Sequence, residues 1–382
     1  MRILFDSKLS QFKTPFGMLL PGQGCRLRVD IPVSCRTVKA EGIFLQDDAL
    51  TEAVRAPLAK AEANALYEAW SGEVSLPAAG LYFYYFFITT QNEAFRLYKQ
   101  GNDTNMEAGD LWQVSCVEDR FPAPEYAKGA VMYQIFVDRF YNGDRTNDVE
   151  TGEYAYIGEH SVRVEDWSKY PAFMGVREFY GGDLKGVLEK IDYLQELGVE
   201  AVYFNPLFVS PSNHKYDIQD YDFIDPHYGV IVEDGGEVLT DGCLDNSQAT
   251  KYQIRTTNRK NLEASNAFFA ELVQEFHRRG IKVIIDGVFN HCGSFNKWMD
   301  RERIYENAEG YDKGAYVSAD SPYRNYFDFH NQAAWPYNNS YDGWWGHDTL
   351  PKLNYEGSQE LMDYVLHVAK KWVSPPYNVD GW

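Results

Sequence analysis

The segment DLKGVLEKIDYLQELGVEAVYF, residues 183–204, decides the fold of the longer part of the chain. Its apolar residues recur at helical spacing, Gly198 can end the helix, and the β-rich run VEAVYF (199–204) predicts a strand directly afterwards. The residues predicted to form the inward face of this helix are Leu184, Val187, Leu188, Ile191, Leu194 and Leu197. With the earlier strand VMYQIF (131–136), the segment predicts a βαβ unit, the building block of a parallel sheet covered by helices.

The same pattern returns twice further along the chain. A second helix is predicted near 265–279, with Ser265 as its N-cap and Gly280 as its stop before a strand at 281–285. Its inward residues would be Phe268, Phe269, Leu272, Val273 and Phe276. Those of a third helix, which leads into NVDGW (378–382), would be Leu361, Val365, Val368 and Trp372. The sequence therefore predicts four parallel strands, interrupted by an insertion at about 230–262 and by a small aromatic subdomain at about 292–357.

The first part of the chain has a different sequence pattern. Short β-like runs alternate with turn residues, which predicts an all-β sandwich over residues 1–122. The runs are LRVDIPV (27–33), LYFYYFFITT (81–90) and LWQVSCV (111–117). Pro122 and Pro124 stiffen the link FPAPEY and disfavour regular structure, so we predict a domain boundary there and a second domain over 128–382.

Composition limits the classes of ligand and compartment. The formal charge of −20 would repel nucleic acid, and aromatic residues make up 16% of the chain, which suits either a sugar-binding surface or a rich core. No apolar stretch approaches the roughly 18 residues of a membrane span, and the N-terminal residues lack the apolar core of a signal peptide. Five cysteines without metal-ligand spacing indicate reduced thiols, so a cytoplasmic location is expected.

Polar residues follow two of the predicted strands. The loop 204–229 contains His214 and Tyr216, and the run DGVFNH (286–291) contains Asp286, Asn290 and His291. Because the carboxyl ends of parallel strands meet at one edge of a sheet, these side chains are expected to converge on one cleft. A lone histidine is more often a satisfied core residue, and the convergence is what favours a site for a hydroxyl-rich ligand.

A turn-rich stretch suggests a calcium site. The segment DRFYNGDRTND (138–148) gathers oxygen-bearing side chains at short spacing, and GGDL (181–184) could complete a coordination shell. The candidate ligands are Asn142, Asp144, Asn147, Asp148, Gly181 and Asp183. The same residue types are common turn formers, and Asp183 could equally be a helix N-cap.

Several strings, in this order, resemble the α-amylase family of glycoside hydrolases. They are YQIFVDRF (133–140), GGDL (181–184), LFVSPSNHKYDIQDY (207–221), DGVFNH (286–291), LPKLN (350–354) and the terminal DGW. SPSNHKYD and LPKLN are most similar to the neopullulanase, cyclomaltodextrinase and maltogenic-amylase branch. The resemblance implies an N-terminal β-sandwich followed by the first half, strands 1–4, of a (β/α)₈ TIM barrel with a small domain inserted after strand 3. It extends over residues from about 130 to 382.

The resemblance also implies roles for particular residues. His214, Tyr216 and His291 would contact the sugar at the cleavage point, with Tyr216 stacked on its ring. Asp286 would be the buried aspartate that orders the site, accompanied by Asn290. The six oxygen-bearing residues named above would hold a structural Ca²⁺.

The family's catalytic carboxylates are not expected among these residues. In the family, the motif that begins DGW continues Arg-x-Asp to the nucleophile, whereas this chain ends at Trp382. The resemblance therefore implies that the intact parent is a retaining hydrolase of α-1,4 links in maltodextrin, cyclodextrin or pullulan, that this chain is a fragment inactive alone, and that the N-terminal domain can mediate a homodimer. The alternative is a non-catalytic carbohydrate-binding or accessory protein of the same fold.

Overall fold

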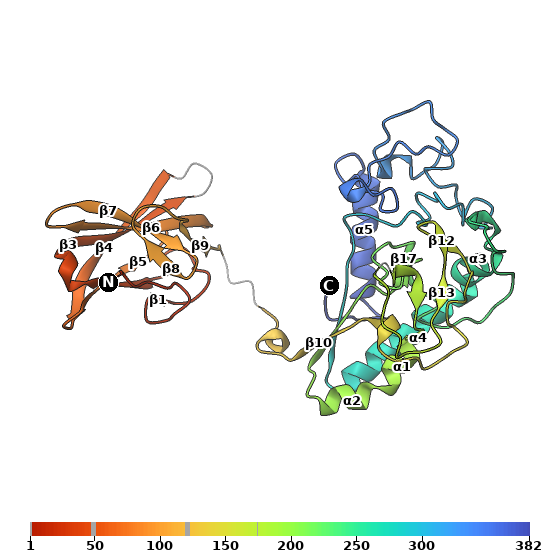
Figure 1. The fold of residues 1–382 in the computed structure, drawn as a ribbon, viewed down its shortest axis with the longest axis horizontal. Coiled ribbons are helices and arrows are strands. Elements are labelled where there is room, and N and C mark those ends of the chain that lie inside the picture. Colours follow the sequence, from red (N-terminus) through yellow and green to blue (C-terminus); the bar gives the residue numbers. More distant parts are fainter. Residues whose placement is uncertain (1, 47–50, 119–122, 174) are drawn as a thin grey trace. The chain divides into compact units, whose positions relative to one another are not determined.

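A computed structural model describes residues 2–46, 51–118, 123–173 and 175–382. The chain divides into two compact units, which meet in the sequence at Ala123 and Pro124 (Figure 1). The boundary predicted at Pro122 lies outside the described residues. None of the helices in the described part is both long enough and apolar enough to cross a membrane.

The first unit is an antiparallel sheet. Its strands within the described residues are β1 Lys13–Thr14, β2 Cys25–Pro32, β3 Thr37–Gln46, β4 Thr51–Ala63, β5 Tyr67–Val74, β6 Gly80–Thr90, β7 Ala94–Gln100, β8 Asp103–Asn105 and β9 Trp112–Cys116. They pair in the order β1-β2-β5-β4-β3-β6-β7-β8, and β9 pairs with β6. The long strand β4 pairs with β3 through Leu58 and with β5 through Ala59, so it joins both halves into one curled sheet. The all-β character predicted for this region is present; the two separate layers of a sandwich stay a prediction.

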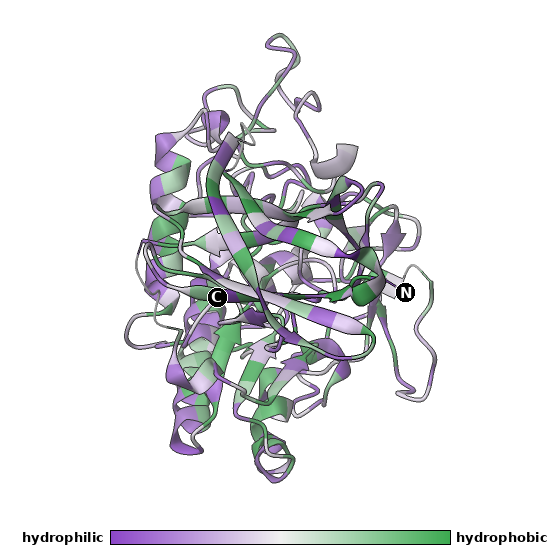
Figure 2. Cartoon of the chain, turned by 90° about the vertical axis from the view of Figure 1, so that its left-hand side faces the viewer, coloured by the Kyte–Doolittle hydropathy of each residue, from purple (hydrophilic) through white to green (hydrophobic). Residues whose placement is uncertain are grey.

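Alternating side chains build the core of the first unit. Figure 2 shows hydrophobic and hydrophilic residues alternating along strands, as expected where one face of a sheet is buried. Along β2, Leu27, Val29 and Ile31 are buried. From the other half of the sheet, Phe44 and Tyr84 stack with ring centroids 4.8 Å apart. These side chains belong to one hydrophobic cluster, so the curled sheet closes around a single core.

The second unit contains the parallel sheet predicted from the βα pattern. Strands β10 Met132–Ile135, β15 Ala201–Phe204 and β18 Lys282–Ile285 lie side by side in chain order, and every pairing is parallel. Near the end of the chain, Gly381 forms one parallel bridge with Ile284, and the Asp380 N–H donates to the Val283 carbonyl at 2.7 Å. The fourth predicted strand is therefore a single bridge, and a closed or half-closed barrel stays a prediction.

Helices cover one face of this sheet (Figure 1). The described helices are α1 Leu184–Glu189, α2 Ile191–Glu196, α3 Thr250–Thr257, α4 Arg259–Arg278 and α5 Gln359–Trp372. Apolar residues of α1, α2, α4 and α5 pack with Val202, Phe204, Val283 and Ile285 in one core, whereas Tyr252 of α3 belongs to a separate cluster. Because β-strand side chains alternate, the intervening residues Ala201, Tyr203 and Ile284 point to the opposite face.

Two local predictions were wrong. Ser265 does not begin a helix: α4 begins earlier, where the Asn258 side chain accepts from the Lys260 N–H, and Ser265 is buried in its interior, donating to the Asn261 carbonyl at 2.8 Å. Leu197 is 52% exposed, because the helix breaks at Lys190 and α2 ends at Glu196, which turns Leu197 away from the core.

The remaining segments are irregular and carry short elements. The short strands are β11 Ala155–Tyr156, β12 Glu159–His160, β13 Val162–Arg163, β14 Glu178–Phe179, β16 Phe208–Val209 and β17 Asp220–Ile224. The predicted insertion at 230–262 contains α3 and the first turn of α4. The predicted subdomain at 292–357 is mainly turns, and its Trp298, Tyr326 and Phe329 join the core of the sheet.

Candidate functional site

The candidate site lies where β15 and β18 end. These strands are neighbours in register, so the loop after Phe204 and the run after Ile285 leave the sheet at the same edge. One side of β15 and β18 is packed against helices, and their carboxyl ends are free to present polar side chains. The structure thus brings together the two segments in which the sequence placed its five substrate-binding candidates.

Tyr216 and Asp286 form the direct link between the two segments. The Tyr216 hydroxyl donates to Oδ2 of Asp286 at 2.8 Å. Asp286 is half-buried, so the fully buried aspartate implied by the resemblance is not what this structure shows. Burial, and then the neighbouring Asp286, raise the pKa of Tyr203 to about 12 and raise that of Tyr216 further. Both phenols therefore stay protonated donors beside a carboxylate acceptor.

His214 stands beside the Tyr216 ring. The two ring centroids are 5.8 Å apart, and Nδ1 of His214 lies 3.1 Å from the backbone nitrogen of Tyr216. Nδ1 also lies 3.1 Å from the Ser212 hydroxyl, so the protein holds this side of the ring in place. No described residue hydrogen-bonds to Nε2, and the side chain is half-buried. A neutral imidazole in this position can present Nε2 to a ligand hydroxyl.

His291 is more enclosed than the sequence suggested. It is 5% exposed, its Nε2 lies 3.1 Å from the Tyr216 carbonyl, and Asn290 Nδ2 lies 3.4 Å from its Nδ1. Burial lowers its pKa, so the ring is neutral at neutral pH. Trp344 covers one face, nearly parallel at 15° and 4.8 Å between centroids. His291 thus fixes the Tyr216 backbone, whereas Asn290 is exposed at the surface.

The residues between these candidates point the opposite way. Lys215, which separates His214 from Tyr216, is 1% exposed and adopts a positive φ of 56°. Its Nζ lies 2.6 Å from Oδ2 of Asp225 and also donates to the Ser210 carbonyl. Asp217 is buried as well, where it accepts from the hydroxyls of Ser210 and Ser212. One loop therefore carries an outward pair and an inward pair of polar side chains.

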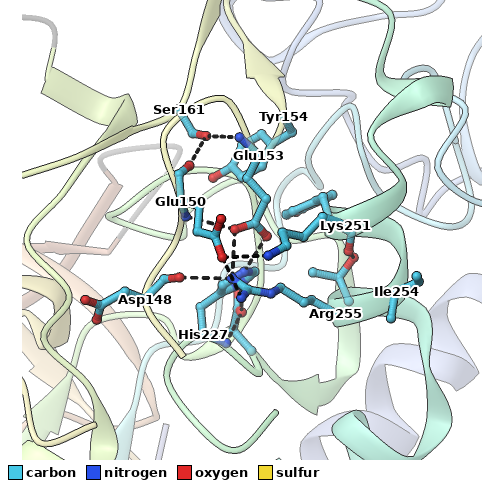
Figure 3. Close-up of polar contacts among 12 residues, drawn as sticks. Asp148, Glu150, Glu153, Tyr154, Ser161, His227, Lys251, Ile254 and Arg255 are labelled. Carbon is cyan, nitrogen blue, oxygen red and sulfur yellow. Dashed lines mark hydrogen bonds and ion pairs between the residues drawn. The ribbon is translucent and has the colours of Figure 1, made fainter. Parts of the chain in front are cut away.

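Lys215 belongs to a larger buried ion cluster, and Figure 3 shows the part of it around Glu153, His227 and Arg255. Its buried members are Lys215, Asp225, His227, Glu153 and Arg255, and the more exposed Asp234 and Glu150 extend it through their ion pairs with Arg255. The His227 ring bridges two carboxylates, with Nδ1 at 2.8 Å from Asp225 and Nε2 at 2.8 Å from Glu153. Arg255, from α3, donates to Glu153 at 3.0 Å, to both oxygens of Asp234 and to the Asp148 carbonyl. The cluster ties the predicted insertion to the loop that carries His214 and Tyr216.

Charge balance keeps this cluster ionised. Each of its basic side chains, Lys215, His227 and Arg255, pairs with at least one carboxylate, which offsets the cost of removing these charges from water. Burial opposes the charged form of His227, but Glu153 and Asp225 outweigh burial and raise its pKa to about 8. Burial likewise opposes the charged form of Asp225, but Lys215 and His227 outweigh it and hold the pKa of Asp225 well below its ordinary value. Its five buried members, Lys215, Asp225, His227, Glu153 and Arg255, present no face to a ligand, so we assign the cluster a structural role.

The six calcium candidates separate into two groups. Asn142, Asn147, Asp148 and Gly181 gather in one place: Asn142 Nδ2 donates to Asp148 at 2.7 Å, and both side chains would collide with a Cβ at Gly181. The side-chain oxygens of Asn142 and Asn147 are buried and have no hydrogen-bond partner among the described residues. Burial raises the pKa of Asp148 to about 6. The unpaired amide oxygens suit a calcium ion, whereas the Asp148 carboxylate already pairs with Arg163 at 2.8 Å and would have to share that partner with the ion.

The other two candidates already have structural partners. Asp183 is the N-cap of α1, and its carboxylate accepts from the N–H groups of Gly186 at 2.5 Å, Gly143 at 3.1 Å and Asp144 at 2.7 Å. Asp144 accepts from both the backbone and the hydroxyl of Thr146. Among the described residues, no group of three or more His, Cys, Asp or Glu side chains is placed to hold a metal. Any ion here would depend mainly on amide and carbonyl oxygens.

Sequence reasoning missed the buried ion cluster and the tryptophans beside His291. Glu153, His227 and Arg255 come from segments far apart in the chain, and each alone reads as an ordinary surface charge or a core histidine. The sequence did contain one signal of the buried cluster, because Lys215 is a charged residue directly between the two site candidates His214 and Tyr216. A cavity of about 860 Å³ between α3, the start of α4 and residues 307–311 contains none of the predicted site residues.

Comparison with known proteins gives a consistent family. The family described as alpha amylase, catalytic domain, matches residues 134–239 and 255–382. The unmatched residues 240–254 lie inside the predicted insertion. An amylopullulanase of Thermoanaerobacter thermohydrosulfuricus is 27% identical over 97% of this chain and 25% of its own length. Neopullulanase 2 of Thermoactinomyces vulgaris is 33% identical over 78% of this chain and 41% of its own length.

A solved structure resembles the chain across both units. The type III pullulan hydrolase from Thermococcus kodakarensis matches 99% of this chain with a TM-score of 0.53 and 25% identity. The match covers 55% of that protein. The chain thus spans only between a quarter and about half of the length of the proteins it matches here.

Proposed function

The chain belongs to the alpha-amylase family, and from this premise we propose that it supplies the substrate-binding side of a retaining hydrolase of α-1,4-glucosidic bonds. The substrates we propose are maltodextrin, cyclodextrin or pullulan, in keeping with the names of the neopullulanase and pullulan hydrolase that the chain resembles. The observation that carries the proposal is the meeting of His214, Tyr216, Asp286 and His291 at the ends of β15 and β18.

These residues suit a neutral, hydroxyl-rich ligand. The Tyr216 ring offers a flat apolar surface to a pyranose, and its orientation is set by the bond to Asp286. His214 offers Nε2 to a hydroxyl, and Asp286 offers a carboxylate oxygen. His291 and Asn290 hold the edge of the loop, with His291 acting on the Tyr216 backbone. Each group is held by the protein before a ligand arrives, which favours binding.

We do not assign the carboxyl groups that cleave the glycosidic bond to any of these residues. Retaining hydrolysis requires two carboxyl groups about 5–5.5 Å apart, one as the nucleophile and one as the acid that protonates the leaving oxygen. We assign Asp286 to the orientation of the Tyr216 ring, whose hydroxyl donates to it at 2.8 Å. We therefore propose that the 382-residue chain binds α-glucan without hydrolysing it.

The experiment combines binding with turnover. Titration calorimetry with maltoheptaose should show binding, and incubation with cyclodextrin, pullulan and starch should release no reducing sugar. The matched variants are Tyr216→Ala, which should lose binding, and Tyr193→Ala, an exposed tyrosine on α2 that should not. Absence of binding by the unaltered chain would contradict the proposed ligand class. Release of sugar would contradict the proposal that these residues do not supply the two catalytic carboxyl groups.

A structural calcium ion is a second element of the proposal. Asn142, Asn147 and Asp148 would hold it through side-chain oxygens, with the Gly181 carbonyl nearby, and Asp144 and Asp183 would shape the surrounding turn. The ion would link the turn at 142–148 to the start of α1. Its contribution is to stability, and none of its ligands touches the proposed sugar contacts.

The first unit and the compartment complete the proposal. Phe16 and Met18 are exposed apolar side chains on the first unit, which suits the homodimer implied by the family resemblance. Analytical ultracentrifugation of the chain and of Phe16→Ser should give a dimer and a monomer respectively; two equal masses would contradict this interface. The unpaired cysteines are consistent with a cytoplasmic location.

A further inference from the structure

Three flat rings form a continuous stack that begins at His291. The ring planes of His291 and Trp344 are 4.8 Å apart between centroids at 15°, and those of Trp344 and Trp345 are 4.3 Å apart at 14°. Near-parallel planes at these separations are in contact, so Trp344 is covered on both faces. The stack runs from the candidate site outward to a single terminal indole.

The inner end of the stack is held firmly. His291 pairs with Lys352 in an antiparallel bridge, and Gly343 pairs with Pro351 in another. The Trp344 N–H donates to the Leu350 carbonyl at 2.9 Å. The segment 343–352 is therefore a tight hairpin fixed to the same His291 that fixes the Tyr216 backbone.

The outer end of the stack is exposed at some energetic cost. Trp345 is 81% exposed, although burial of so large an apolar side chain is favourable. Its backbone has φ 51° and ψ 26°, a left-handed conformation that non-glycine residues adopt rarely and at a cost. The short helix Trp344–Gly346 is interrupted at this residue for that reason. The fold thus keeps the indole of Trp345 exposed to solvent in spite of both costs.

From this arrangement we infer that Trp345 is a stacking platform for a glucosyl unit of an α-glucan, next to the unit bound at Tyr216. This inference rests on the proposed function and deepens it. The face of Trp345 that Trp344 does not cover is flat, apolar and rigidly oriented, which matches the apolar face of a pyranose ring. Trp344 separates Trp345 from His291 in the stack, so Trp345 would contact a glucosyl unit other than the one at Tyr216.

The surroundings suit the rim of such a contact. His347, Asp348 and Lys352 are exposed polar residues of the same hairpin and can hydrogen-bond to sugar hydroxyls around the stacked ring. Asp348 is paired with Arg301 at 2.6 Å, so the hairpin presents little net charge to a neutral ligand. An apolar platform with a polar rim is the usual composition of a small-ligand contact.

The test compares ligands of different length. Trp345→Asn removes the indole but tolerates the left-handed backbone, and Trp345→Phe retains a ring. Trp345→Asn should weaken binding of maltoheptaose about tenfold while leaving maltose binding unchanged, since about 1.4 kcal/mol corresponds to one stacking contact of this kind. Trp345→Phe should recover most of the loss. Tyr170→Ala is the matched control, because Tyr170 is an exposed aromatic elsewhere in the second unit and should have no effect.

The outcomes separate this inference from the proposed function. If the unaltered chain and Trp345→Asn bind maltoheptaose equally while Tyr216→Ala loses it, the platform is wrong and the ligand class stands. If Trp345→Asn weakens maltose and maltoheptaose by the same factor, the residue serves no neighbouring unit and the inference is overturned. If the unaltered chain binds neither ligand, the proposed function itself fails.

Discussion

The loop at 205–229 carries two polar groupings that differ in their access to water. Lys215 and Asp225 lie in the sealed ion cluster with His227, whereas His214 and Tyr216 lie at the open edge of the sheet. The two groupings alternate along the same few residues, and the sealed one satisfies every charge it contains with an opposite partner. The buried residues Lys215 and Asp225 therefore order the loop, and this order places His214 and Tyr216 where they can contact a ligand.

The largest expected effect is removal of a partner from the sealed cluster. Arg255→Met removes one of the two cations that pair with the buried Glu153 and leaves His227 as the other, and breaking one side of a buried pair costs about 3–5 kcal/mol. Arg259→Met, whose side chain is 69% exposed and pairs with Glu263, should change stability by less than about 1 kcal/mol. Urea unfolding of the second unit measures both free energies. Equal losses in the two variants would show that the cluster is not the element that orders this unit.

A second effect is the pH dependence of the same cluster. The pKa of His227 is raised from 6.5 to about 8 in the folded chain, so its contribution is fully present below about pH 6.5 and is lost as pH rises through about 8. The shift corresponds to about 2 kcal/mol. The free energy of unfolding should therefore fall between pH 6 and 9, where the carboxylates stay ionised. His227→Gln should remove this fall; an unchanged slope in that variant would contradict the assignment to His227.

Substitution at the open edge should separate stability from binding. Tyr216→Phe removes only the hydroxyl that donates to Asp286, so unfolding should change by about 1 kcal/mol or less. Affinity for maltoheptaose should fall several-fold, because the ring orientation and the Asp286 acceptor both change. Calorimetric titration measures the affinity for maltoheptaose, and urea unfolding of the same preparation measures the free energy of unfolding. Loss of stability with unchanged affinity would place Tyr216 with the sealed residues instead.

The smallest effect concerns calcium. Adding a chelator should lower the melting temperature of the second unit by about 2–4 °C, the shift expected for about 1 kcal/mol in a domain of this size. Asn147→Ala removes one unpaired amide oxygen and should show a much smaller shift on chelation. Thermal unfolding by circular dichroism measures the difference. Identical melting curves of the unaltered chain with and without chelator would remove calcium from the account.

Local patterns predicted the elements, and long-range pairing explains what they missed. The strands at 131–136, 199–204 and 281–285 and the inward residues of α5 follow from periodicity alone. Ser265 was predicted as an N-cap because serine often caps helices. In the structure Asn258 caps α4, and the Ser265 hydroxyl is buried, where it accepts from the Val230 N–H. Leu197 fits the helical spacing of the apolar residues. The helix breaks at Lys190, however, so the residues after the break face a different direction and Leu197 no longer faces the core.

The candidate site was predictable in part for the same reason. His214, Tyr216, Asp286 and His291 follow predicted strands, so their convergence could be expected from topology. The enclosure of His291 depends on Trp344, which is more than 50 residues away in an irregular segment with no periodic signal. The sealed cluster joins segments near 150, 225 and 255, and no local pattern reports such a pairing.

The side-chain NMR signals of the histidines test the central claim most directly. They are to be assigned by His214→Gln and His227→Gln and recorded during titration with maltoheptaose. The account predicts that the His214 signals move with the binding isotherm while those of His227 stay in place. Movement of His227 without His214, or binding that moves neither, would contradict the claim that the open edge meets the glucan and the sealed cluster only supports it.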